Sequence, residues 1–370
     1  MNAKLGRRRV EKRSHARRDL LCQLCKGFTL RPSEGSELFP GSEVSVDEVL
    51  KIENLQTHFF TDEGVARAVD GVSLSIGKKR ILGLVGESGC GKSMTALSVL
   101  KLVPSPPGRI VGGKITLAGK DILSLSEIEM RNIRGKLASM IFQEPMTSLN
   151  PVFTIGSQVS EAVRIHTGMG RSEAEGIAVE YLAKVGLADA GRRMSQYPHQ
   201  LSGGMKQRVM IAMALCLKPA LLIADEPTTA LDVTIQAGIL RLMKEMQEET
   251  GAAILLITHD LGVIAEMADE VAVMYAAKVV EAGPCREIFS SFLHPYTEGL
   301  FRSLPGRTAK GERLYTIAGA VPSALAFPPA CRFHTRCPLA VERCRREEPP
   351  LLEVGAGHRC ACWVRCGGTA

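Results

Sequence analysis

The sequence lacks any apolar run long enough to cross a membrane. Such a run needs about 18 residues, and the nearest candidate, residues 209–217, ends at Lys218 and Pro219. The basic N-terminus is not followed by the long apolar core of a secretory signal, so we expect no such signal. We therefore expect a chain that does not cross a membrane by itself, although it can sit on a membrane partner.

The sequence also lacks a basic surface that is spread along the chain. The 370 residues carry a formal net charge of +7, with an ordinary 45% hydrophobic and 23% charged content. Most of the excess positive charge lies in residues 4–18, which favours a basic tail over a nucleic-acid groove. We expect residues 1–48 to be a disordered extension, with a membrane-surface role as the alternative. Its Cys22 and Cys25 are too few for a metal site.

One stretch of the chain points to phosphate chemistry. Gly86-Glu-Ser-Gly-Cys-Gly-Lys92-Ser93 follows an apolar predicted strand, 81–85, and precedes a predicted helix, 94–100. Glycines let the N–H groups of such a loop point at one anion, and a helix N-terminus adds partial positive charge. Lys92 can reach terminal phosphates, and Ser93 can place its hydroxyl on Mg²⁺. The alternative is a glycine-rich turn that happens to precede a lysine.

Polar residues also follow three other apolar predicted strands. They are Gln143, the pair Asp225 and Glu226, and His259. An open α/β sheet places ligand contacts at the carboxyl ends of its strands. Asp225 is therefore suited to Mg²⁺, and Glu226 to polarising a water that attacks the γ-phosphate. A structural role is the alternative for His259.

Two further features are suited to a nucleotide. Ser202, with Gly203 and Gly204, opens a long predicted helix and makes a second N-terminus that can receive an anion. An ordinary N-cap is the alternative there. Phe59 lies between the first two predicted strands, ahead of the phosphate loop. An exposed ring at that place can stack on a purine, and core packing is the alternative.

Helical spacing dominates from residue 146 to about residue 200. Helices are predicted over 155–165 and 172–185, and Ser172 with Glu175 predicts a capping box for the second helix. We expect this region to be a helical insert in the α/β domain.

Together these motifs resemble the ATP-binding subunit of an ABC transporter. In chain order they look like its Walker A loop (Gly86–Ser93), Q-loop (Gln143), signature (Leu201–Met205), Walker B strand (Leu221–Glu226), D-loop (Thr229–Asp232) and H-loop (His259). The resemblance implies that ATP is bound by Phe59, Gly86, Glu87, Ser88, Gly89, Cys90, Gly91, Lys92, Ser93 and Met94, with Ser202, Gly203 and Gly204 acting across a subunit pair. It implies catalytic roles for Glu226, His259 and Gln143, and Mg²⁺ ligation by Ser93, Gln143 and Asp225.

The C-terminal part narrows the resemblance to one branch. His294-Pro-Tyr-Thr, Gly319-Ala-Val-Pro and a set of cysteines from Cys331 onward are similar to the oligopeptide/dipeptide importer ATPases. Met205 in the signature also looks like this branch. The resemblance covers about residues 49–363. It implies a P-loop NTPase (ABC ATPase) α/β core over 49–292, with an antiparallel β subdomain and a helical subdomain at about 146–200, and a small cysteine-containing extension over 293–370.

The resemblance also implies partners and a location. Such ATPases work as head-to-tail pairs, here more often with a similar but distinct second ABC ATPase subunit. They sit on two transmembrane permease subunits at the cytoplasmic face of the inner membrane, and an extracytoplasmic solute-binding protein acts on the permeases. Peptides are the expected cargo, with nickel or another small solute as the alternative. No nucleic acid is expected, although the rival interpretation is a non-transport ABC ATPase acting on nucleic acid or ribosomes.

The cysteines of the extension form a candidate metal site. Four thiolates suit Zn²⁺ or an iron–sulfur cluster, and disulfides are improbable in the cytoplasm. The set Cys331, Cys337, Cys344 and Cys362 resembles relatives that carry a [4Fe–4S] cluster, with zinc and free thiols as alternatives. Cys360 could replace Cys362. We expect the cluster to hold the extension folded, because the residues assigned to ATP lie elsewhere.

Overall fold

The computed structural model describes residues 48–143, 148–229, 231–304, 315–355 and 357–366. The predictions made for the basic tail, including Cys22 and Cys25, fall outside these residues.

A four-stranded antiparallel sheet precedes and follows the phosphate loop in sequence. Its order is β2-β1-β4-β5, formed by β1 (Glu48–Thr61), β2 (Gly64–Gly77), β4 (Gly108–Leu117) and β5 (Lys120–Asp121). Buried apolar side chains recur along β1 and β2, as a sheet with one covered face requires. The strand β1 is longer than the sequence indicated, so Phe59 lies inside it rather than between two strands. The predicted antiparallel subdomain is confirmed.

The second sheet has eight strands in the order β11-β12-β10-β9-β3-β8-β7-β6. Its parallel part consists of β3 (Ile81–Val85), β6 (Ala138–Ile141), β7 (Leu221–Asp225), β8 (Ala253–Ile257) and β9 (Glu270–Tyr275). Every residue of β3, β7 and β8 is buried, which explains their nearly continuous apolar sequences. Because these strands run parallel, the residues that follow them meet at one edge of the sheet.

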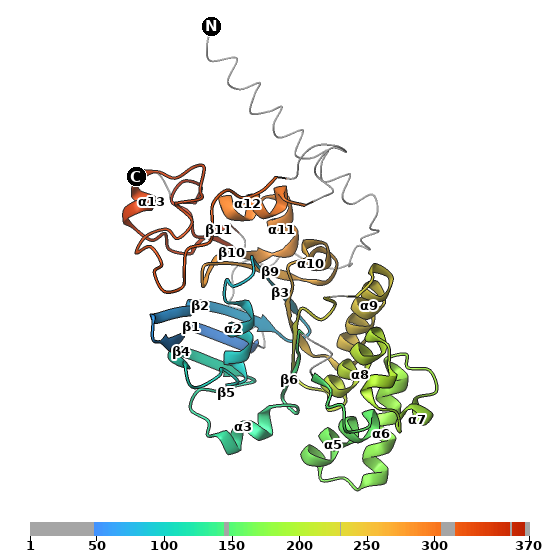
Figure 1. The fold of residues 1–370 in the computed structure, drawn as a ribbon. Coiled ribbons are helices and arrows are strands. Elements are labelled where there is room, and N and C mark those ends of the chain that lie inside the picture. Colours follow the sequence, from blue (N-terminus) through green and yellow to red (C-terminus); the bar gives the residue numbers. More distant parts are fainter. Residues whose placement is uncertain (1–47, 144–147, 230, 305–314, 356, 367–370) are drawn as a thin grey trace, which may run out of the picture. The chain divides into compact units, whose positions relative to one another are not determined.

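The helices divide between the two sheets (Figure 1). They are α2 (Lys92–Val99), α3 (Glu127–Ile133), α5 (Ile155–Thr167), α6 (Arg171–Lys184), α7 (Ala190–Arg193), α8 (Gly203–Leu215), α9 (Val233–Thr250) and α10 (Leu261–Met267). Helix α2 lies by the antiparallel sheet, whereas α5, α6 and α7 gather beyond β6 as the predicted helical insert. In the described part of the chain, no helix has the length and apolarity to cross a membrane.

The cap of α6 differs from the prediction. Gly168 ends α5 in the left-handed conformation (φ 72°), and the chain turns early enough for α6 to begin at Arg171. Gly170 is then the N-cap, and its N–H donates to Glu173 Oε2 at 3.2 Å. The predicted box of Ser172 and Glu175 is therefore wrong, and Glu175 instead forms an ion pair with Arg171.

The C-terminal extension continues the core sheet. It follows β10 (Lys278–Pro284) and contributes α12 (Pro295–Arg302), α13 (Glu342–Arg346), β11 (Leu352–Gly355) and β12 (His358–Cys360), with α11 (Cys285–Ser290) before it. Strand β12 pairs antiparallel with β10. Tyr296, Phe301 and Phe333 are buried in the same apolar cluster as Ile81 and Val85 of β3. The extension thus shares the core of the ATPase fold, as its shortage of apolar residues requires.

Candidate active site

The phosphate loop is shaped by two glycines that no other residue could replace without displacing the backbone. Gly86 and Gly91 have φ of +153° and +108°. A Cβ on Gly86 would lie 2.2 Å from the carbonyl oxygen of Met274, and one on Gly91 would lie 2.3 Å from that of Ala68. The loop is therefore packed tightly between β9 and β2 at the end of β3.

Lys92 folds over this loop from the start of α2. Its Nζ donates to the carbonyl oxygens of Gly86 at 2.8 Å and Glu87 at 3.1 Å, and the residue is only 6% exposed. Gly91 is the N-cap of α2, and no side chain caps that helix. A buried ammonium beside an uncapped helix N-terminus favours an anion at this place.

Ser93 and Asp225 provide oxygen atoms suited to Mg²⁺. The Ser93 hydroxyl is close enough to the Asp225 carboxyl to act on its pKa, and Asp225 Oδ1 is buried without a hydrogen-bond partner among the described residues. Burial raises the pKa of Asp225 above its ordinary value, although the Ser93 hydroxyl acts in the opposite direction. A buried carboxylate oxygen next to a hydroxyl matches the hard oxygen ligands that Mg²⁺ prefers. These residues therefore fit the ion that the fold family implies.

The Glu226 carboxylate contacts the other two predicted catalytic residues, Gln143 and His259. It has a φ of +48°, a strained value for a side chain of this kind, and its N–H donates to the carbonyl oxygen of Ile257 in β8 at 2.8 Å. Its Oε2 accepts from Gln143 Nε2 at 3.0 Å and from Thr229 Oγ1 at 2.9 Å. Its Oε1 lies 3.3 Å from His259 Nδ1. Three residues that follow separate strands or turns thus converge on one carboxylate.

The surroundings of Glu226 keep this carboxylate ionised. Burial acts to raise its pKa, but the hydrogen bonds from Thr229 and His259, with the charges of His259 and Lys92, outweigh that effect. The pKa of Glu226 is therefore lower than its ordinary value. Such a carboxylate is charged at neutral pH and can accept a proton from a water molecule.

Phe59 lies half-buried on β1, opposite Ala66 of β2 and Gly108 of β4. Thr57, two residues earlier, shares a buried 2.8 Å hydrogen bond with Ser98 of α2. This bond joins the strand that carries Phe59 to the helix that begins at the phosphate loop. Part of the Phe59 ring packs, and the rest is accessible to solvent.

Ser202 begins α8 in a different part of the molecule. Its Oγ accepts from the N–H of Met205 at 3.4 Å, and both Ser202 and Gly203 are exposed. A Cβ on Gly204 would lie 3.0 Å from the Ile235 side chain of α9. Figure 1 shows α8 near α5 and α6 and apart from α2.

The cysteines of the extension lie close to one another. Burial raises the pKa of Cys331 to about 11, and the neighbouring thiols of Cys344, Cys337 and Cys362 act in the same direction. The Cys331 N–H also donates to the carbonyl oxygen of Cys344 at 3.2 Å. Cys360 has Cys366 and Cys362 as its neighbouring thiols. Among the described residues, no three cysteine, histidine or acidic side chains are arranged to hold a single metal ion. A [4Fe–4S] cluster takes one thiolate on each iron, a wider arrangement than one ion requires.

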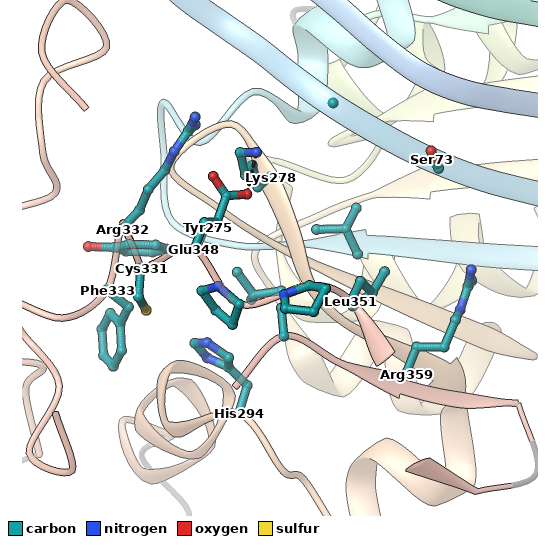
Figure 2. A pocket seen from close by; sticks show the side chains of 16 residues that line it. Ser73, Tyr275, Lys278, His294, Cys331, Arg332, Phe333, Glu348, Leu351 and Arg359 are labelled. Carbon is teal, nitrogen blue, oxygen red and sulfur yellow. Dashed lines mark hydrogen bonds and ion pairs between the residues drawn. The ribbon is translucent and has the colours of Figure 1, made fainter. Parts of the chain in front are cut away.

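A cavity of about 350 Å³ lies beside this cysteine group rather than beside the phosphate loop. Figure 2 shows its lining, where Lys278 of β10 faces Glu348 of the extension, with Cys331 and His294 nearby. Lys278 and Glu348 form an ion pair, and Arg332, also in the lining, pairs with Asp70 of β2. The cavity therefore lies where the extension packs against the two sheets.

Two residues that contact the phosphate loop were missed by sequence reasoning. Arg336 pairs with Glu87, and Tyr296 accepts a hydrogen bond from the Glu87 N–H. Tyr296 belonged to a motif used only to identify the branch, and Arg336 looked like one of several basic residues among the cysteines. The signal that could have indicated them is Glu87, because an acidic residue in an anion-binding loop is expected to pair with a nearby cation.

The comparisons with known proteins agree with this site. Residues 69–229 match the model for the family "ABC transporter", and residues 280–344 match "Oligopeptide/dipeptide transporter, C-terminal region". The chain is 51% identical to the oligopeptide transport ATP-binding protein AppD of Bacillus subtilis, over 85% of this chain and 96% of that one. It is 46% identical to the dipeptide transport ATP-binding protein DppD of Escherichia coli, with the same coverage.

A solved structure agrees as well. The dimeric structure of the ATP-binding cassette MJ0796 in a post-hydrolysis state, bound to ADP and Pi, has a TM-score of 0.58 at 27% identity. The match covers 64% of this chain and 99% of that one. The chain therefore belongs to the ATP-binding proteins of ABC transporters, in the branch with the oligopeptide/dipeptide transporter C-terminal region.

Proposed function

We propose that this chain binds and hydrolyses ATP and thereby energises an ABC importer for peptides. The observation that carries the proposal is the convergence of Gln143, Thr229 and His259 on the Glu226 carboxylate. Glu226 directly follows Asp225, a buried carboxyl whose pKa is raised by burial, although its neighbours Ser93 and Lys92 act to lower it. A base, a cation site and an anion loop are thus adjacent, as phosphoryl transfer to water requires.

The residues of the site divide the tasks of this reaction, and Gln143 takes part in two of them. N–H groups of the loop Gly86–Ser93 and the Lys92 ammonium bind the phosphates, and Phe59 stacks on the adenine. Glu226 takes the proton of the attacking water, while Gln143 and His259 hold its carboxylate in place. Ser93, Asp225 and Gln143 would hold Mg²⁺, which when bound neutralises charge on the β- and γ-phosphates.

A second subunit completes the site. Ser202, Gly203 and Gly204 begin α8 apart from the phosphate loop of the same chain, so we place them over the γ-phosphate bound by a partner. The related cassette MJ0796 has been solved as a dimer. We propose a head-to-tail pair, most often with a distinct second ABC ATPase, in which ATP bridges the subunits because it binds the closed pair more tightly.

Two variants separate binding within the chain from contact across the pair. Lys92→Ala removes the charge that meets the phosphates, so the full chain purified alone should lose ATP binding. Ser202→Arg should leave that binding intact and prevent ATP-dependent pairing, because Ser202 is exposed and caps α8, which lies apart from the helix α2 that Lys92 begins. Calorimetric titration and light scattering measure the two properties. Loss of ATP binding by folded Ser202→Arg protein would contradict the head-to-tail arrangement.

The relatives support a proposal for the cargo and the remaining partners. Relatives that are 47–51% identical to this chain are named for peptide, oligopeptide or dipeptide transport. We propose that this chain serves two transmembrane permease subunits at the cytoplasmic face of the membrane, and that a solute-binding protein delivers peptide to the outer side. The alternative cargo is nickel or another small solute, and transport of such a solute would replace peptide in this proposal.

We further propose that Cys331, Cys337, Cys344 and Cys362 hold a [4Fe–4S] cluster. The support is that Cys331 has Cys344, Cys337 and Cys362 as its neighbouring thiols, and that its N–H donates to the carbonyl oxygen of Cys344 at 3.2 Å. This arrangement favours Cys362 over Cys360 as the fourth ligand. Bound there, the cluster would cross-link segments of an extension that has little core of its own.

A further inference from the structure

The phosphate loop is held from outside by two side chains of the C-terminal extension. Arg336 Nη1 and Nη2 donate to the two carboxylate oxygens of Glu87 at 2.8 and 3.1 Å, a bidentate pair. The N–H of Glu87 donates to the Tyr296 hydroxyl at 2.8 Å. The second residue of the loop is therefore fixed through both its side chain and its backbone.

Contacts outside the phosphate loop also hold the Arg336 side chain in place. Its side chain is only 5% exposed, and its Nε donates to the carbonyl oxygen of Ala318 at 3.0 Å. Nη2 also donates to the carbonyl oxygen of Ile317 at 3.3 Å, and the guanidinium carbon lies 5.7 Å from the centre of the Tyr275 ring. A guanidinium held in this way presents its two N–H groups at a set angle and loses little entropy on pairing.

Tyr296 is equally rigid. It is completely buried, and its ring centre lies 4.6 Å from that of Tyr275. Its position at the start of α12 is set by His294, whose Nδ1 accepts from the Tyr296 N–H at 3.1 Å. The hydroxyl of such a side chain is a fixed point to which a flexible, glycine-rich loop can be attached.

We propose that Arg336 and Tyr296 are positioning residues that hold the phosphate loop ready for ATP. The inference rests on the proposed binding of ATP by Gly86–Ser93. A loop already held in the bound shape avoids the cost of becoming ordered when the nucleotide arrives. Arg336 also neutralises Glu87, whose carboxylate would otherwise repel the negatively charged triphosphate.

The same contacts link the extension to the nucleotide. Arg336 directly precedes Cys337, so the fold of the cysteine segment determines where its guanidinium lies. Because coupling between two sites is reciprocal, an extension that favours the bound shape of the loop is itself stabilised when ATP binds. The extension therefore contributes to the free energy of ATP binding, although none of its side chains is assigned to contact ATP.

The test is the affinity of the full chain for Mg-ATP, measured by calorimetric titration. Arg336→Gln should weaken binding by at least about fivefold, a typical size for coupling between two sites. Adding Glu87→Gln to Arg336→Gln should weaken binding little further, because Arg336 acts through the Glu87 carboxylate. A role of Arg336 that bypasses Glu87 predicts that the two losses add, so additive losses, or no loss in Arg336→Gln, overturn the proposal.

Matched variants keep the result interpretable. Arg346→Gln, in the same extension but paired only with Glu342 on the surface, should bind ATP as the unchanged chain does. If Arg336→Gln does not fold, Tyr296→Phe removes a single hydroxyl and should still weaken binding by about threefold; unchanged binding then overturns the proposal. Normal ATP binding by Lys92→Ala would instead reject the proposed nucleotide site itself.

Discussion

At the scale of single residues, the spacing of motifs predicted which side chains meet. Gln143, Glu226 and His259 each follow a buried apolar strand, and parallel strands bring their carboxyl ends to one edge of a sheet. The contact between Thr229 and Glu226 and the lowered pKa of Glu226 depend on exact side-chain positions, which spacing does not encode. The pair of Arg336 and Glu87 joins residues 249 positions apart, beyond the reach of any local pattern.

Glu226→Gln tests the role of the carboxylate. The amide keeps the shape and can still hydrogen-bond to its neighbours, but it cannot take a proton from water. We expect ATP still to bind, while turnover in the assembled transporter falls by about 10²–10⁴, the range for loss of a general base. Phosphate release measures turnover. Glu266→Gln on the exposed surface of α10 is the matched control, and turnover near the unchanged level in Glu226→Gln would exclude Glu226 as the base.

At the scale of elements, apolar runs predicted the strands of the parallel sheet well, whereas the ends of elements and long-range pairs were harder. The sequence predicted a capping box at Ser172, but the chain turns directly after Gly168, so α6 begins at Arg171 and Gly170 is its N-cap. The pairing of β12 with β10 was not predicted, because three residues of alternating exposure carry too little pattern. The pairing places Cys360 opposite Glu281 of β10.

The cysteine segment gives a prediction about cofactor content. Protein purified without oxygen should be brown and contain iron and acid-labile sulfide. Cys337→Ser should bleach it, whereas Cys360→Ser should stay brown because Cys362, and not Cys360, is among the thiols that neighbour Cys331. Colourless anaerobic protein with stoichiometric zinc would favour the zinc alternative, and metal-free protein would favour free thiols.

The contact of Arg336 changes one expectation drawn from the sequence. The sequence placed the residues assigned to ATP far from the cysteines, so loss of the cluster was expected to leave nucleotide binding intact. Arg336 is adjacent to Cys337 and holds Glu87 of the phosphate loop. We now expect Cys337→Ser to weaken ATP binding as well, in the same direction as Arg336→Gln.

At the scale of the whole molecule, the predicted architecture is confirmed from the antiparallel sheet to the helical insert. The motifs predicted this architecture because each one lies at the end of a strand or the start of a helix. They did not predict how closely the extension joins the rest: it adds strands to the core sheet, pairs Arg332 with Asp70 of β2 and holds the phosphate loop. Lys92 begins α2 and Ser202 caps α8, two helices that lie apart in the molecule.

The central claim is that ATP hydrolysis by this chain drives the import of peptides. The most direct test is the ATP turnover of the complete transporter in vesicles, measured with and without the peptide-loaded solute-binding protein. We predict that the loaded binding protein raises turnover and that peptide accumulates only when ATP is present. Stimulation by nickel or another solute but not by any peptide, or turnover that ignores the binding protein, would contradict the account.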